Sequence, residues 1–183
     1  MLTISFAPFV PIETERLILR QINHDDVNEL FFLRADEAVM KYIDRPRALS
    51  LEDAYKHIEL VDTLFKNNEG ITWAIALRDT PKMIGYIGIW RINKECHRAE
   101  IGYASHPNSW NKGIISEAIL PVCDFAFNQM KLHSLEANIN PENEGSRKVL
   151  EKAGFRKEAY FTENYFFEGK FLDSEIYSKL STW

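Results

Sequence analysis

Apolar and polar residues alternate along the first part of the chain in a pattern that predicts a strand and then a helix. The run Leu17-Ile18-Leu19-Arg20 is short and β-prone, and it predicts the strand. Asn23 lies three residues before Asp26 at the spacing of a helix N-cap, where a side-chain oxygen accepts a free amide of the first turn. We expect this helix to continue to about Arg34.

A second helix is predicted to begin after Ser50, because Asp53 follows it at the spacing of a capping box. Its apolar positions recur at helical spacing and are Ala54, Ile58, Val61 and Phe65. After the polar segment 67–70, stretches rich in β-branched and aromatic residues predict three strands. These are residues 72–77, 83–92 and 99–105, with Thr80-Pro81-Lys82 and residues 93–98 as the connections.

The segment after Gly113 predicts a third helix with one apolar face. That face holds Ile115, Ile119, Val122, Ala126 and Met130. Pro121 conflicts with this pattern because it lacks a backbone donor, so we expect it to kink the helix or shift its end.

The last third of the chain predicts a strand, a short helix and a hairpin. Residues 135–139 form the strand, and residues 143–153 form the helix, which Gly154 ends. A strand then begins near Phe155 and turns at Glu168-Gly169-Lys170 into a final strand at residues 173–178. The order β-α-α-β-β-β-α-β-α-β-β indicates an α+β (layered α/β) fold, and the absence of linkers indicates one domain over residues 1–183.

Composition narrows the class of partner. The chain has 183 residues and a formal net charge of −5, which argues against nucleic acid and is compatible with an amine or a basic peptide. Cys96 and Cys123 are too few for a disulfide framework, which favours a reducing cytoplasm. No apolar run approaches the ~20 residues of a membrane span, so we expect no membrane partner. The five histidines lack metal-ligand spacing, so no metal is expected.

The turn that leads into the third helix predicts an anion site. Residues 110–118 follow a predicted strand and contain Gly113, which lets the backbone approach a ligand. The first amides of a helix have no partner within it and lie at the positive end of its dipole, where a pyrophosphate can bind. An ordinary loop before a helix has the same pattern, so this signal is weak alone.

Four ordered motifs make the pattern specific. They are residues 13–20, the stretch from Arg98 through His106-Pro107 to Ala118, residues 143–155, and Glu168-Gly169-Lys170 with Asp173 and Tyr177. From Glu13 to Leu180 the chain resembles the GCN5-related N-acetyltransferase (GNAT) superfamily, and within it the RimJ/RimL-like ribosomal-protein N-acetyltransferase branch. The resemblance implies a mixed, mostly antiparallel twisted sheet with helices on both faces.

The resemblance also implies acetyl-CoA as co-substrate. Its pyrophosphate is expected on Asn111, Lys112, Gly113, Ile114, Ile115 and Ser116. Asn111 and Ile115 replace the smaller residues usual in the family, so this cradle must depend on backbone amides. The pantetheine arm is expected between strands 99–105 and 135–139, against the backbone of Ala104 and Ser105 and the side chains of Asn143 and Ser146.

The resemblance assigns two residues to catalysis. Glu100 is expected to act as a general base through water, and the alternative is a structural carboxylate paired with a cation such as Arg91 or Arg98. Ser146 is expected to hydrogen-bond the leaving thiolate, and the alternative is an ordinary first-turn serine. Many relatives carry a tyrosine at the position of Leu150, so the thiolate's proton donor stays open, with Tyr103 and Tyr165 as outside candidates.

The acceptor is less determined. The residues expected to shape its cleft are Phe31, Arg34, Tyr42, Trp90 and Phe166. The favoured function is transfer of an acetyl group to a primary amine, most plausibly a protein N-terminus, within a ternary complex. A small amine or amino-sugar antibiotic as acceptor, or a non-catalytic coenzyme-A-binding module, are the alternatives. The sequence is compatible with a homodimer and does not fix the oligomeric state.

Overall fold

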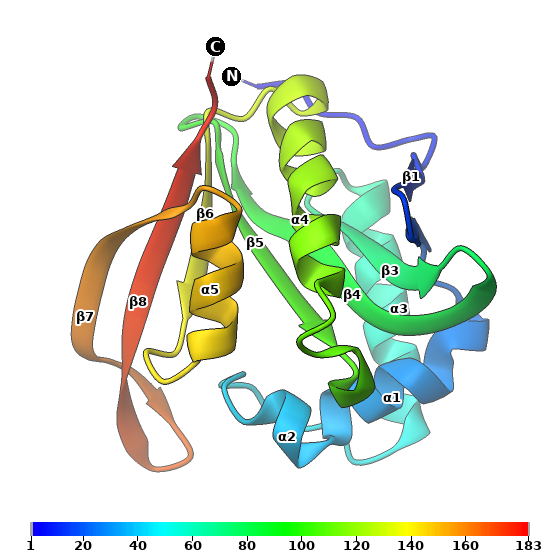
Figure 1. The fold of residues 1–183 in the computed structure, drawn as a ribbon, viewed down its shortest axis with the longest axis horizontal. Helices are drawn as coiled ribbons and strands as arrows, with labels where there is room; N and C mark the ends of the chain where they lie inside the picture. The colour runs from blue at the N-terminus through cyan, green and yellow to red at the C-terminus, as the bar shows by residue number, and fades with distance from the viewer. Residues whose placement is uncertain (1, 183) are drawn as a thin grey trace.

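One twisted sheet of eight strands forms the centre of the molecule, with helices on both of its faces (Figure 1). The computed structural model describes residues 2–182. The strand order is β1-β2-β3-β4-β5-β6-β8-β7, and within this sheet β5 and β6 form the parallel pair. This mixed, mostly antiparallel architecture confirms the predicted fold class.

The elements follow the predicted order with small additions. The strands are β1 (Ile12–Glu13), β2 (Leu17–Gln21), β3 (Ile71–Leu77), β4 (Thr80–Asn93), β5 (Arg98–Ser105), β6 (Ser134–Ile139), β7 (Arg156–Phe167) and β8 (Lys170–Leu180). The helices are α1 (Val27–Ala35), α2 (Glu37–Met40), α3 (Leu51–Lys66), α4 (Ile114–Asp124) and α5 (Glu144–Lys152). Short 3-10 turns at His24–Asp26 and Pro107–Ser109 precede α1 and α4, and a π-helical turn, Phe125–Gln129, follows α4.

The predicted caps are present at the helix starts. Asn23 and Asp26 form a capping box that opens the 3-10 turn before α1. Ser50 and Asp53 form a second capping box at the start of α3. Gly154 has a φ of 85°, so it ends the α5 region in the left-handed conformation expected of it. Local sequence alone therefore determines these boundaries.

The first predicted hairpin connection is wrong. The turn between β3 and β4 is formed by Arg78 and Asp79, and Thr80-Pro81-Lys82 belongs to β4. Thr80 pairs with Leu77 and Met83 pairs with Ala76, so Pro81 lies in a bulge between two registered pairs. A proline cannot donate to a ladder, and a bulge removes that requirement.

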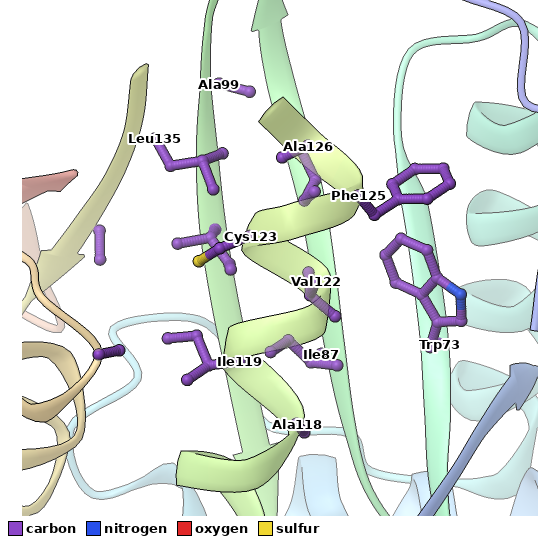
Figure 2. Packing of buried hydrophobic residues seen from close by; sticks show 14 of the residues in the cluster. Trp73, Ile87, Ala99, Ala118, Ile119, Val122, Cys123, Phe125, Ala126 and Leu135 are labelled. Atoms are coloured by element: carbon purple, nitrogen blue, oxygen red, sulfur yellow. The ribbon is translucent and has the colours of Figure 1, made fainter. Parts of the chain in front are cut away.

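The main core lies between one face of the sheet and α4 with the π-helical turn that follows it. Ile115, Ile119, Val122, Ala126 and Met130 are all buried, as their spacing predicts. Figure 2 shows this side of the helix packed over Ile87 and beside Leu135. Pro121 lies inside α4, and the bonding changes to the π-helical pattern at Phe125. The expected irregularity is thus a wider turn and not the end of the helix.

The parallel pair β5–β6 is short. Arg98, Ala99 and Glu100 pair with Ser134, Leu135 and Glu136, and no registered pair follows. β6 continues to Ile139 along β8 instead, and β5 continues to Ser105 along β4. Figure 1 shows the two strands diverging below α4 and α5. This separation leaves one backbone edge of residues 101–105 without a partner strand.

A second, smaller core covers the opposite face. It contains Leu30 and Leu33 of α1, Ala54 and Ile58 of α3, and Ala74 of β3. The two cores take alternate residues of β3, as the two-residue period of a strand requires. Within residues 2–182 we find no helix long and apolar enough to cross a bilayer.

We predict that Ile119→Ala lowers the free energy of unfolding by about 2–5 kcal/mol, because it leaves a cavity in the main core. The matched control is Leu120→Ala, since Leu120 is the next residue of α4 and is 50% exposed, whereas Ile119 is fully buried. The control should change stability by less than about 0.5 kcal/mol. Denaturant unfolding measures both, and equal losses would contradict the packing described.

Candidate active site

A cavity of about 510 Å³ lies where the second core meets the diverging strands. Its walls come from α1, the loop after α2, α3, β4, β5, the end of β6 and the β7–β8 hairpin. The charged and aromatic residues that line it are Arg34, Tyr42, Asp44, Arg45, His57, Glu69, Tyr86, Trp90, Arg91, Glu100, Tyr103, Tyr165 and Asp173. This volume is in the range of small-molecule sites.

Glu100 is held on the cavity wall by two donors. The Trp90 Nε1 atom donates to Glu100 Oε1 at 3.0 Å, and Arg91 Nη1 lies 2.8 Å from Glu100 Oε2. Arg91 adopts a φ of 51° beside an irregularity in the β4–β5 register. The cation pairing weighed as an alternative is therefore present. A carboxylate has about four lone-pair sites, so two donors leave capacity for a water molecule.

The position of Trp90 depends on a glycine. A Cβ atom on Gly102 would lie 2.5 Å from the Trp90 ring, closer than real Cβ atoms approach a neighbour. The indole therefore occupies the space that a side chain at position 102 would fill. Because Trp90 donates to Glu100, this glycine also determines where the carboxylate lies.

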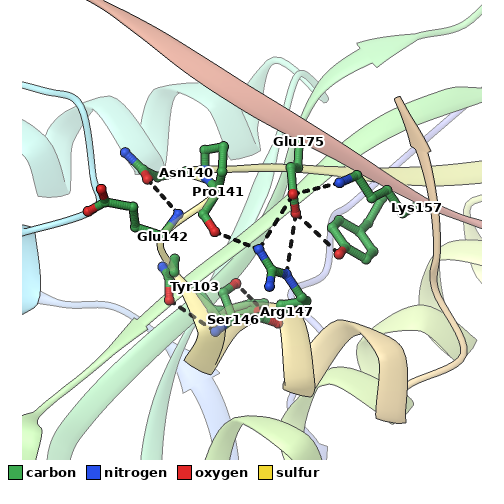
Figure 3. A network of polar contacts seen from close by, with 10 residues as sticks. Tyr103, Asn140, Pro141, Glu142, Ser146, Arg147, Lys157 and Glu175 are labelled. Carbon is green, nitrogen blue, oxygen red and sulfur yellow. Dashed lines mark hydrogen bonds and ion pairs between the residues drawn. The ribbon is translucent and has the colours of Figure 1, made fainter. Parts of the chain in front are cut away.

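Tyr103 and Ser146 meet across the gap between β5 and α5. The Tyr103 hydroxyl lies 2.8 Å from Ser146 Oγ, and the Ser146 amide donates to Asn143 Oδ1 at 3.0 Å (Figure 3). Burial raises the pKa of Tyr103, so the phenol keeps its proton at neutral pH. Asn143 acts as the N-cap of α5 through its oxygen, which leaves its amide group as a donor. Leu150 is fully buried in the main core, so its side chain does not reach the gap.

A buried carboxylate anchors this region from behind. Glu175 is 3% exposed. Its carboxylate oxygens lie 2.6 Å from Lys157 Nζ, 3.4 Å from Arg147 Nε and 3.2 Å from the Tyr177 hydroxyl, which donates to them (Figure 3). Arg147 also donates to the carbonyl of Pro141. The cluster thereby ties the turn before α5 to β7 and β8. The sequence pattern did not point to Glu175, because its partners come from three separate segments.

The turn before α4 has the backbone form that an anion site needs. Asn111 and Gly113 have φ values of 59° and 74°, both in the left-handed region. The amide of Glu117 donates to the Gly113 carbonyl at 2.9 Å, and the helix amides before it have no carbonyl available within the helix. Ile114 and Ile115 are buried in the core. Their side chains are thus directed into the core, and the cradle is left to the backbone.

Two further contacts shape the same turn. The Trp110 Nε1 atom donates to the Ser105 carbonyl at 2.9 Å, which ties the turn to the end of β5. Arg16 Nη1 donates to the Lys112 carbonyl at 3.0 Å, and Arg16 also pairs with Glu117. Arg16 adds a positive charge beside Gly113 that the sequence reasoning missed. Free amides, a left-handed glycine and the unpaired edge of β5 together fit the pyrophosphate and pantetheine arm of coenzyme A.

The structure separates the residues expected in the acceptor cleft into two groups. Arg34, Tyr42 and Trp90 line the cavity. Phe31 packs beside the second core, and Phe166 is 60% exposed next to Phe171 at the tip of the hairpin. Neither of these two phenylalanines lines the cavity. The cavity residues not anticipated include Asp44, Arg45, His57 and Tyr86, which no sequence motif connects.

Comparison with known proteins agrees with this geometry. Residues 16–156 match the family model described as an acetyltransferase (GNAT) domain. The chain is 35% identical to YoaA of Bacillus subtilis, an uncharacterized N-acetyltransferase, over 93% of this chain and 96% of YoaA. It is 22% identical to the spermidine N(1)-acetyltransferase of Vibrio cholerae, over 86% of this chain and 89% of that protein.

Solved structures show the same fold. An acetyltransferase of Bacillus anthracis superposes with a TM-score of 0.83 at 29% identity, covering 93% of this chain and 98% of that one. The ribosomal-protein-S5-alanine acetyltransferase of Vibrio fischeri superposes with a TM-score of 0.84 at 24% identity. The match covers 94% of this chain and 97% of that one. RimL in complex with coenzyme A superposes with a TM-score of 0.84 at 19% identity. The match covers 93% of this chain and 98% of that one.

The fold and the site therefore define an acetyl-CoA-dependent N-acetyltransferase. The chain belongs to the GNAT acetyltransferase family. The solved structures that share its fold include RimL and a ribosomal-protein-S5-alanine acetyltransferase. Across residues 2–182, histidine, cysteine and carboxylate side chains form no group of three or more able to hold a metal ion.

We predict that His57 stays neutral down to about pH 4. Burial, followed by the positive charges of Arg34 and Arg45, lowers its pKa to about 4. An unfolded histidine titrates near ~6.5, so between these values the unfolded chain binds more protons and this contribution to stability falls as the pH falls.

NMR titration of the His57 ring, assigned with His57→Gln, measures this pKa. Arg45→Gln should raise the His57 pKa, because it removes a repelling charge. Arg47→Gln should leave it unchanged, since Arg47 is an exposed residue of the same loop that pairs with Glu37. An unshifted His57 titration near pH 6.5 would show that the described burial is wrong.

Proposed function

We propose that this protein transfers the acetyl group of acetyl-CoA directly to a primary amine held in the cavity, within a ternary complex. The observation that carries the proposal is the placement of Glu100 and Tyr103, a base and a phenolic donor, on one cavity. Both residues lie on β5, and the gap where the thioester would bind opens at Glu100.

Direct transfer is supported by the lack of a thiol nucleophile among the described residues of the cavity. No cysteine is among the residues that line the cavity. Cys123 is buried in α4, and burial raises its pKa to about 12, which keeps it as an inert thiol. Among the described residues of the cavity, therefore, no thiolate is available to carry the acetyl group as a covalent intermediate.

The neutral amine attacks the thioester carbonyl, a C–N bond forms, and the C–S bond breaks as the tetrahedral intermediate collapses. A proton leaves the amine through water to Glu100. The departing thiolate accepts a hydrogen bond from the Tyr103 hydroxyl, which its contact with Ser146 holds in place. The proton taken up by Glu100 returns through water to the thiolate, which releases the free thiol and restores the carboxylate.

We propose an α-amino group, most plausibly a peptide N-terminus, as the acceptor. Its pKa of ~8 leaves more neutral amine at pH 7 than a lysine side chain of ~10.4. The Vibrio fischeri neighbour is named for a ribosomal protein, which favours this choice. The relative named for spermidine supports a small amine as the second candidate.

One observation favours the small-amine candidate. The Tyr165 hydroxyl donates to the Asp44 carbonyl at 2.8 Å, so the β7–β8 hairpin is tied to the loop after α2 across the cavity. This contact narrows the space available to a long peptide. Thiol release from acetyl-CoA, measured over a panel of peptides and small amines, distinguishes the two acceptors. The non-catalytic alternative is abandoned if any acceptor exceeds hydrolysis.

We predict that Glu100→Gln lowers kcat/KM by about 10²–10⁴-fold and removes the acidic limb of its pH profile, because the amide cannot accept the proton. The matched control is Glu136→Gln, since Glu136 also pairs with an arginine, Arg98, but lies outside the cavity. An unchanged pH profile in Glu100→Gln would remove the base assignment.

We predict that Tyr103→Phe and Ser146→Ala each slow single-turnover acetyl transfer by about tenfold or more, because a thiolate leaves more slowly without its donor. The double variant should lose little beyond the larger single effect, since the two residues share one hydrogen bond. Rapid-quench measurement with excess enzyme tests this. Wild-type rates in both single variants would place the donor elsewhere.

A further inference from the structure

Two arginines of the cavity have no counter-ion. Arg34 comes from α1 and Arg45 from the loop after α2, and both line the cavity. In the part of the chain that the structure describes, no carboxylate lies within ion-pair distance of either guanidinium. Arg34 Nε is the one buried side-chain nitrogen or oxygen among residues 2–182 without a hydrogen-bond partner. A buried polar group without a partner is costly, which makes it a sign of a missing ligand.

Arg45 lies close to the reacting groups. Its guanidinium is 5.8 Å from the centre of the Trp90 ring, and Trp90 donates to Glu100. One indole therefore separates a free cation from the proposed base. His57 adds no further positive charge to this pair, because burial and the two arginines keep it neutral.

The acidic residues of the cavity do not neutralise this pair. Glu100 is paired with Arg91, and Asp173 accepts from Tyr160 and from the amide of Glu163. Glu69 is exposed. Asp44 forms no ion pair, and burial raises its pKa with no arginine opposing the rise. The positive charge of Arg34 and Arg45 is thus available to a ligand.

We infer that the acceptor amine carries an anionic group, a carboxylate or a phosphate, that binds Arg34 and Arg45 while its amine faces Glu100. This inference rests on the proposed function. The planar guanidinium donors match the oxygens of either anion. A small amino acid or aminoalkyl phosphate has this chemistry, and so does a peptide N-terminus followed by an acidic residue.

Matched acceptors test the inference. The small pairs are 4-aminobutyrate with 4-aminobutanamide, and phosphoethanolamine with ethanolamine. The peptide pair is Ala-Glu-Ala-Ala amide with Ala-Gln-Ala-Ala amide. We expect kcat/KM, from thiol release, to favour at least one anionic member by about tenfold or more, as for one good charge-assisted contact.

Two variants assign the preference to the arginines. Arg45→Gln should reduce it severalfold, whereas Arg47→Gln should keep it, because Arg47 is in the same loop but outside the cavity. Arg34→Lys keeps a charge but loses the Nε donor, and its fold is checked by thermal unfolding. A preference limited to the small pairs identifies a small acceptor, and one limited to the peptide pair identifies an acidic N-terminus.

A binding measurement tests the inference without relying on acetyl transfer. The anionic member of a preferred pair should raise the NMR pKa of His57, because it neutralises the arginines beside that ring, and its neutral partner should not. Equal kcat/KM for every pair, with no shift of His57, would overturn the inference and leave acetyl transfer intact. Failure of all acceptors to exceed hydrolysis would instead overturn the proposed function.

Discussion

The divergence of β5 and β6 after Glu100 is the constraint on which the rest of this molecule depends. A sheet whose strands separate leaves backbone donors and acceptors without partners, and burial makes each of them costly. Here α4 and α5 cover the gap on one face, and Tyr103 bonds to Ser146 across it. The backbone groups that lose their sheet partners line a slot, where an extended ligand can form the missing hydrogen bonds. The cavity opens beside this slot because the same strands form its wall.

Two buried carboxylates hold the parts of the site in place, and each has its own donors. Glu100 accepts hydrogen bonds from Trp90 and Arg91 of β4, which fixes this wall of the cavity. Glu175 forms ion pairs with Lys157 and Arg147, which fixes the start of α5. Removing one partner from such a cluster leaves a charge in a poor environment, so these groups specify geometry more than they add stability.

The sequence determined what is local and missed what is assembled from distant segments. The capping boxes at Asn23 and Ser50, the apolar face of α4 and the left-handed Gly113 follow from residues close together in the chain. The turn at Arg78 and Asp79 was missed because Thr80-Pro81-Lys82 has turn-like composition, whereas a bulge at Pro81 keeps this segment in the ladder. Arg45 and His57 carry no sequence motif, since their proximity arises only when the loop after α2 folds against α3. Phe166, which was expected to shape the acceptor cleft, lies outside the cavity near the tip of the β7–β8 hairpin, because its position in the sequence does not show which way the hairpin bends.

The glycine beneath Trp90 has a consequence for how such a protein can change over evolutionary time. One face of that indole contacts the backbone at Gly102, its edge donates to Glu100, and Arg45 lies over its ring. A substitution that moves the ring to suit a new acceptor amine also moves the carboxylate of Glu100, which the ring holds by a hydrogen bond. Divergence toward new acceptors is therefore easiest through residues that do not touch the indole, such as those on α3 and the hairpin. Relatives that share this indole would then differ in the cavity residues of α3 and the hairpin, while the residues that contact the indole stay the same.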